Sequence, residues 1–150
     1  MRRKLQVADL GDLLDQPLNA ILAISLANDE VLLAPVWYEW RDGGFSAFTE
    51  ADGVKHRYIE RDPRVSIVVA ENGGINRGIE VRGIAHISRD GVNNICRRIT
   101  SRYLPPELAA PFVQQLERVG MVHVRIEPGK LRAWDFADEI GGWREETVSY

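Results

Sequence analysis

Short runs of apolar or alternating residues, separated by turn residues, constrain the fold of this chain more than any other feature. An alternating run predicts a half-buried strand, and a short continuous apolar run is consistent with a buried one. Such runs span residues 20–26, 31–40, 45–49, 64–70, 79–87, 122–126 and 131–136. Strands joined by tight turns pair in antiparallel fashion. The sequence therefore predicts a mainly β protein, a small β-barrel with appended helices.

Helical periodicity replaces this alternation in three segments, residues 52–61, 91–103 and 108–119. Residues 1–17 are expected to form a lead-in helix or loop, and residues 138–150 a flexible tail. A chain of 150 residues is long enough for one domain with its own core, so 1–150 is predicted to be a single domain.

Three finer predictions concern the path of the chain. The first three runs are expected to form a meander, with residues 31–40 as one strand. Pro128-Gly129 predicts a turn, after which residues 131–136 lead back. Gly83 interrupts an alternating run, which indicates a β-bulge or a close approach of two backbones.

Composition disfavours several classes of protein. The formal net charge of −3 argues against nucleic-acid binding as the main task. No run of about 18 apolar residues is present, so no membrane span is expected. Cys96 is the single cysteine, and a reducing compartment, the cytoplasm, is the simplest expectation. The histidines, His56, His86 and His123, lie far apart and predict solvated residues and no metal site.

Cationic residues gather where the third run ends and the first helix begins. They are Lys55, Arg57, Arg61 and Arg64, close in sequence to Thr49. At a strand-to-helix junction such side chains can converge on a phosphate, helped by the N–H groups of the helix start. A solvated basic helix explains the same residues equally well. Trp37 and Trp40 fit either the core, which is the default, or the wall of a planar ligand.

Several of these segments together resemble one known family. They are Pro35-Val36-Trp37-Tyr38, Phe48-Thr49, Val54-Lys55-His56-Arg57, Arg61-Asp62-Pro63-Arg64-Val65-Ser66, Arg77-Gly78-Ile79-Glu80-Val81-Arg82-Gly83, Arg102-Tyr103 and Arg132-Ala133-Trp134-Asp135. Their order and spacing are similar to the split-barrel family related to pyridoxamine 5′-phosphate oxidase. Within that family they resemble the branch of flavin- and deazaflavin-dependent reductases. The resemblance covers roughly residues 18–137.

The resemblance implies a six-stranded antiparallel split β-barrel of the FMN-binding-protein type. It also implies a homodimer with cofactor sites at the subunit interface, and coenzyme F420 or FMN as the cofactor. The residues that it assigns to the cofactor are Pro35, Val36, Trp37, Phe48, Thr49, Lys55, Arg57 and Trp134. Thr49, Lys55 and Arg57 would hold the phosphate, and the ring would lie along residues 35–37. Trp134 would reach the site from the partner subunit.

The function implied is that of an oxidoreductase that moves a hydride between a bound flavin or deazaflavin and a small organic acceptor. No catalytic side chain is predicted, because the cofactor carries the redox chemistry. The alternative is a non-catalytic carrier or sensor that binds flavin or haem, with His56 or His123 as axial ligand. Ala34 and Gly53, where the family commonly has hydroxyl residues, favour this alternative. A plain dimeric structural domain is the third reading.

Overall fold

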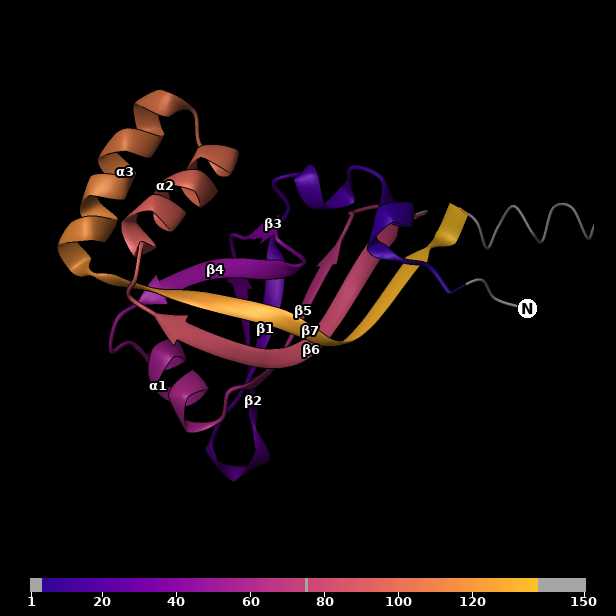
Figure 1. Ribbon diagram of the computed structural model, residues 1–150, viewed down its shortest axis with the longest axis horizontal. Helices are drawn as coiled ribbons and strands as arrows, with labels where there is room; N and C mark the ends of the chain where they lie inside the picture. Colours follow the sequence, from indigo (N-terminus) through magenta and orange to yellow (C-terminus); the bar gives the residue numbers. More distant parts are fainter. Residues whose placement is uncertain (1–3, 75, 138–150) are drawn as a thin grey trace, which may run out of the picture.

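A curled antiparallel sheet of seven strands forms the body of the computed structural model, which describes residues 4–74 and 76–137 (Figure 1). The strands are β1 (Ala20–Ser25), β2 (Val31–Val36), β3 (Glu39–Arg41), β4 (Gly44–Glu50), β5 (Arg64–Ala70), β6 (Arg77–Ser88) and β7 (Met121–Asp135). Their order in the sheet is β2-β1-β5-β6-β7-β4-β3. The predicted mainly β class with appended helices is confirmed. The predicted tail, 138–150, lies outside the described residues.

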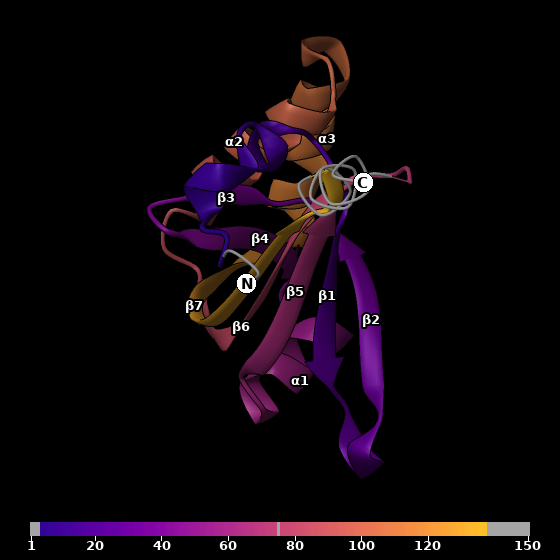
Figure 2. The ribbon, with the colours of Figure 1, turned by 90° about the vertical axis from the view of Figure 1, so that its right-hand side faces the viewer.

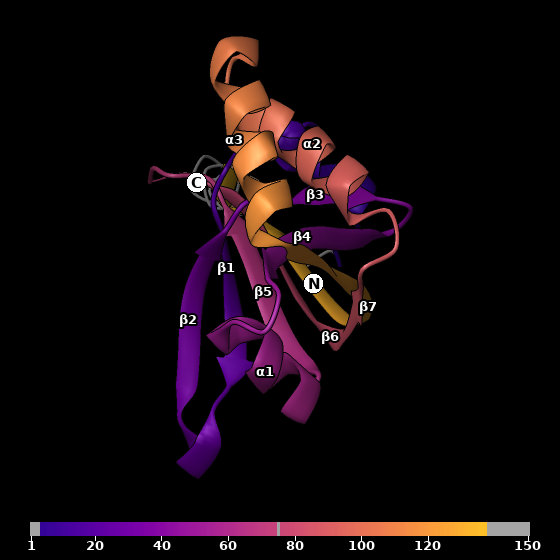
Figure 3. The same cartoon turned by 90° about the vertical axis from the view of Figure 1, so that its left-hand side faces the viewer.

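The described helices are short 3-10 turns η1 (Val7–Leu10), η2 (Leu13–Asp15) and η3 (Ala27–Asp29), and the α-helices α1 (Val54–Arg61), α2 (Val92–Tyr103) and α3 (Pro106–Val119). Helix α2 packs against α3 and against β4 and β7, whereas α1 packs against β1, β4 and β6. Figures 1 and 3 show the α2–α3 pair above strand β4 and α1 below it, on opposite sides of the strands. The sheet is therefore covered by α2 over β4 and β7 and, separately, by α1 over β1, β4 and β6.

The prediction of six strands was wrong, and so was the meander, because residues 31–40 do not form one strand. The chain leaves the sheet at Trp37 and Tyr38, so that β2 pairs with β1 and β3 pairs with β4. The ring of Tyr38 is fully buried, and its hydroxyl donates a hydrogen bond of 3.0 Å to the carbonyl of Gln16. Consecutive strands β2 and β3 thus occupy the two opposite edges of the curled sheet. Figure 2 shows β2 at one edge, beside β1.

The predicted turn at Pro128-Gly129 is also wrong, because β7 runs through these residues as one strand. Its partner β6 is equally continuous, and the register shifts at a bulge between Arg82 and Gly83. A bulge removes a ladder position, so a proline without an N–H is tolerated opposite it. The predicted bulge at Gly83 is confirmed: a Cβ there would lie 2.1 Å from the carbonyl oxygen of Glu127.

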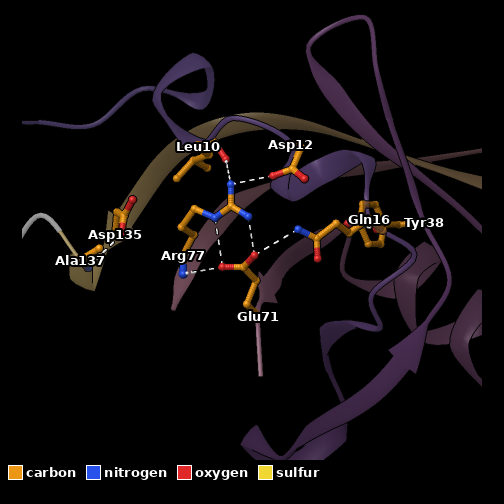
Figure 4. A network of polar contacts seen from close by, with 8 residues as sticks. All are labelled: Leu10, Asp12, Gln16, Tyr38, Glu71, Arg77, Asp135 and Ala137. Atoms are coloured by element: carbon orange, nitrogen blue, oxygen red, sulfur yellow. Dashed lines mark hydrogen bonds and ion pairs between the residues drawn. The ribbon is translucent and has the colours of Figure 1, made fainter. Parts of the chain in front are cut away.

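The lead-in segment is held to the sheet by a network around Arg77 at the start of β6 (Figure 4). The guanidinium donates to Glu71 through both Nε and Nη2, and through Nη1 to the carbonyl of Leu10 at 2.7 Å and to Asp12 at 2.8 Å. Hydrogen bonds from this guanidinium lower the pKa of Glu71 to about 2. Gln16 donates to the same carboxylate at 3.1 Å, so η1 and η2 are tied to the β5–β6 connection.

Candidate functional site

The start of α1 offers the chemistry of an anion site. Gly53 is the N-cap residue and provides no side-chain acceptor, so the first N–H groups of the helix lack an internal cap. The first intrahelical bond of this turn joins the N–H of Arg57 to the carbonyl of Gly53 at 3.1 Å. Neither Lys55 nor Arg57 makes a side-chain hydrogen bond or ion pair within the described residues. Uncapped N–H groups beside free cationic side chains suit a phosphate.

Lys55 and Arg57 flank the buried face of α1 on opposite sides. At 3.6 residues per turn, their side chains leave the helix about 200° apart. Lys55 is half-buried and Arg57 is exposed. Helical side chains point back toward the N-terminus, so an anion in front of the first turn is the position that both can reach.

His56 lies between these two cations and is buried, at 5% exposure, which corrects the prediction of a solvated histidine. Its Nδ1 accepts a hydrogen bond of 2.9 Å from the backbone N–H of Asp52, and its Nε2 lies 2.8 Å from Oε1 of Glu60. A backbone N–H can only donate, so Nδ1 is unprotonated and Nε2 carries the proton that it donates to Glu60. Apart from the position of the histidine in the predicted helix, no sequence pattern indicates this role.

Thr49 and Phe48, both assigned to the cofactor, lie on opposite faces of β4. Thr49 pairs with Val122, which is buried, so its side chain belongs to the inner face of the barrel. Phe48 pairs with His123 on the face that α2 covers. Of these two residues, Thr49 lies on the inner face near the end of β4, five residues before α1 begins at Val54, and is therefore the one close to Lys55 and Arg57 in sequence.

The segment assigned to the ring begins on the edge strand β2 and ends in an aromatic cluster. Pro35 is exposed, whereas Val36 packs against the core, as expected for successive residues of a strand. The indole of Trp37 stacks on Tyr103 with ring centroids 4.7 Å apart and planes 6° apart, and it also contacts Phe112. One face of this indole is thus already covered within the chain.

Trp134 lies far along the sheet from Phe48, Thr49 and the start of α1. It pairs with Gly78 near the end of β7, about 35 Å of strand away from His123 beside Phe48. Its ring covers Gly78, and its Nε1 donates a hydrogen bond of 3.2 Å to Asn76. The guanidinium of Arg132 lies 5.2 Å from the centre of the ring. Within one chain the structure therefore does not bring Trp134 to α1.

A groove that the sequence did not predict crosses the outer face of β1, β5, β6 and β7, with a volume of about 910 Å³. Its charged and imidazole side chains are Arg64, Arg82, His86, Glu127 and Lys130. None of the eight residues assigned to the cofactor lines it. The alternation of β6 predicts that Arg82 and His86 lie on its outer face. The other side chains of the groove join them only through the pairing of β6 with β5 and β7.

The other titratable candidates are engaged or buried. Nε2 of His123 is 2.9 Å from Oγ of Ser46, and burial lowers the pKa of this histidine. His56 is bonded through both ring nitrogens and His123 through Nε2, so neither imidazole proposed for haem offers a free Nε2. Cys96 is buried as predicted, and burial raises the pKa of its thiol to about 11. Over residues 4–74 and 76–137, no group of three His, Cys, Asp or Glu side chains is placed to hold a metal ion.

None of the helices in the described part of the chain is both long enough and apolar enough to span a membrane.

Comparison with known proteins finds relatives by structure and not by sequence. No family model matches the chain, and no curated protein matches it. A conserved hypothetical protein of Mycobacterium tuberculosis is 26% identical, with a TM-score of 0.73 over 90% of this chain and 89% of that one. An F420 reductase is 21% identical, with a TM-score of 0.65 over 80% and 93% of the two chains. A putative pyridoxamine 5′-phosphate oxidase from Listeria innocua is 15% identical, with a TM-score of 0.64 over 84% and 95%.

These structures share the curled antiparallel sheet and its helices. The chain has the split-barrel fold of pyridoxamine 5′-phosphate oxidase-like proteins, and the resemblance seen in the sequence is confirmed at the level of the fold.

Proposed function

We propose that this protein is an oxidoreductase that binds coenzyme F420 or FMN and transfers a hydride between that cofactor and a small organic acceptor. One observation carries the proposal: among the residues that the structure describes, Lys55 and Arg57 have no side-chain partner beside the uncapped start of α1, on a fold shared with an F420 reductase. Charged residues left without a partner at a helix start suit a phosphate ligand better than a stabilising role.

The residues present fit the phosphate end of such a cofactor. Lys55 supplies a mobile ammonium, Arg57 a planar guanidinium, and the first turn of α1 its backbone N–H groups. Strand β2 is an edge strand, so one side of its backbone near Val36 is unpaired and can bond the polar edge of a planar ring. When bound, a flavin or deazaflavin supplies the hydride chemistry, and the chain supplies orientation and a site shielded from water.

We further propose that the outer face of β2 and its neighbours joins two copies of the chain. In register across β2 and β1, Pro35 lies beside Ile21 and Leu33 beside Ala23. Leu33 is 65% exposed and Val31 is 58% exposed, and Pro35 is exposed as well. Alternate residues of β2 thus leave apolar side chains open on this face. A contiguous exposed apolar patch is typical of a protein interface. A second copy on this face would bring residues of one chain, Trp134 among them, toward the cofactor site of the other.

Titration with FMN and with F420, followed by ring fluorescence, tests the cofactor proposal. The double variant Lys55→Gln with Arg57→Gln is expected to weaken binding at least about 100-fold, since it removes two charge-assisted hydrogen bonds of ~1.5–3 kcal/mol each. Arg61→Gln, at the other end of the same helix, is the matched control and should bind like the wild type. Absence of binding by the wild type at micromolar concentrations of both cofactors refutes the proposal.

A turnover assay separates the enzyme from the non-catalytic carrier. The enzyme oxidises its reduced cofactor when a quinone or enone acceptor is added. The carrier binds the cofactor with the same dependence on Lys55 and Arg57 but leaves every acceptor unreduced.

A further inference from the structure

His56 is a buried histidine whose two ring nitrogens have different tasks. Its Nε2 donates to Glu60, one turn further along α1, and the side chain of Glu60 is 62% exposed. Its Nδ1 instead reaches back out of the helix and accepts the N–H of Asp52 at 2.9 Å. The first bond resembles an ordinary surface pair along a helix, whereas the second joins the helix to the turn that precedes it.

The turn held by Nδ1 is conformationally demanding. Asp52 has a φ of 60°, in the left-handed region that residues other than glycine seldom adopt. The N-cap residue that follows, Gly53, has no side chain to fix the helix start. The imidazole therefore fixes the turn from inside the helix, as the N3 side chain of a capping box does by reaching back, and it leaves the first N–H groups of the helix uncapped.

This bond acts on the two cations of the proposed site. Lys55 and Arg57 are the immediate neighbours of His56, and their backbone positions follow the orientation of the first turn of α1. If the turn from Glu50 to Gly53 loosens, the helix start frays, and the N–H groups and both cations lose their common geometry.

We propose that His56 is a positioning residue: its unprotonated Nδ1 holds the 50–53 turn so that Lys55, Arg57 and the start of α1 present one anion site. This inference rests on the proposed function, since the anion is the phosphate of FMN or F420. Its effect is on binding geometry, and His56 itself touches neither cofactor nor acceptor.

Two near-isosteric variants separate the two nitrogens. In His56→Asn, the amide oxygen takes the place of Nδ1 and can still accept the N–H of Asp52, but nothing reaches Glu60. In His56→Gln, the amide reaches Glu60 and the acceptor near Asp52 is lost. Glutamine is also the better helix former, so a purely structural role predicts that His56→Gln is the milder change. Positioning through Nδ1 predicts the reverse order in ligand binding.

The measurement is the dissociation constant for FMN and for F420, together with the urea midpoint of each variant. We expect His56→Gln to weaken binding at least about tenfold and His56→Asn less than about threefold, as loss of one buried hydrogen bond implies. Glu60→Gln, which keeps an acceptor for Nε2, is the control and should bind like the wild type. Equal binding by the two histidine variants, or weaker binding by His56→Asn, overturns the inference while the proposed function stands.

Two further outcomes are distinct. If the wild type binds neither cofactor, the proposed function fails and this inference falls with it. Ring ¹⁵N chemical shifts of the wild-type protein report the tautomer of His56 without any ligand. This measurement tests the inference even if one of the variants fails to fold. A proton on Nε2 supports the geometry, and a proton on Nδ1 contradicts it.

Discussion

Replacement of Arg77 by methionine is expected to release the lead-in segment and to change how stability depends on pH. The arginine and Glu71 side chains are only 23% and 22% exposed, so water replaces their hydrogen bonds incompletely. The carbonyl of Leu10 also loses its donor. Removal of one partner of such a pair leaves the other desolvated, and we expect a loss of about 2–4 kcal/mol in the free energy of unfolding at pH 7.

The pH dependence follows from Glu71. Its pKa in the folded protein is lowered to about 2 from an ordinary value of 4.5, chiefly by hydrogen bonds from Arg77. A lowered folded pKa contributes stability that is fully present above the unfolded pKa and is lost as the pH falls through the folded one. The difference between wild type and Arg77→Met should therefore shrink by about 1 kcal/mol between pH 7 and pH 3, after allowance for partial solvent screening.

Urea unfolding followed by tryptophan fluorescence at pH 7, 5 and 3 measures both effects. Arg82→Met is the matched control on the same strand, because Arg82 is 65% exposed and its partner Glu80 keeps Arg132. The control should lose no more than about 0.5 kcal/mol. The reasoning is refuted if the two variants are equally stable at pH 7, or if the gap between Arg77→Met and the wild type stays constant as the pH falls.

Three further predictions use the same kind of measurement. Gly83→Ala should destabilise the protein by about 2 kcal/mol or more, because the new Cβ meets the Glu127 carbonyl oxygen at 2.1 Å; a urea midpoint like that of the wild type would contradict the bulge geometry. The Cys96 thiol, with its pKa raised to about 11 by burial, should react with a thiol reagent at pH 7.5 only after unfolding, and fast labelling of the native protein would show that it is accessible. Tyr103→Phe should cost about 1–3 kcal/mol in the free energy of unfolding, since its hydroxyl donates to the carbonyl of Leu18 at 2.7 Å; circular dichroism melting checks this, and an unchanged melting temperature would rule the bond out as a support of the lead-in.

The strands with clear alternation were predictable, and the ends of strands at tertiary crossings were not. Residues 64–70 and the bulge at Gly83 follow from local pattern alone. The break at Trp37 does not, because an apolar run continues through it, and the contacts of its indole with Tyr103 and Phe112 come from segments far along the chain. Pro128-Gly129 has the composition of a turn, yet the length of β6 keeps β7 extended.

The candidate site shows the same division. Lys55 and Arg57 were predictable as charges near a helix start, and within residues 4–74 and 76–137 neither has a side-chain partner. His56 was missed, because its role depends on a turn in which Asp52 adopts a left-handed backbone, and single-sequence patterns carry little information on such a conformation. The predicted approach of Trp134 to the site rests on the proposed second copy of the chain, whose position no pattern within one sequence specifies.

The most direct test of the account is a crystal structure of the protein soaked with FMN or with F420. The account predicts density for the cofactor phosphate within hydrogen-bonding distance of Lys55 Nζ and the first N–H groups of α1, with the Arg57 guanidinium turned toward it. Density for the phosphate elsewhere, for instance against Lys130 in the outer groove, would contradict the central claim, as would a soaked crystal with no bound cofactor.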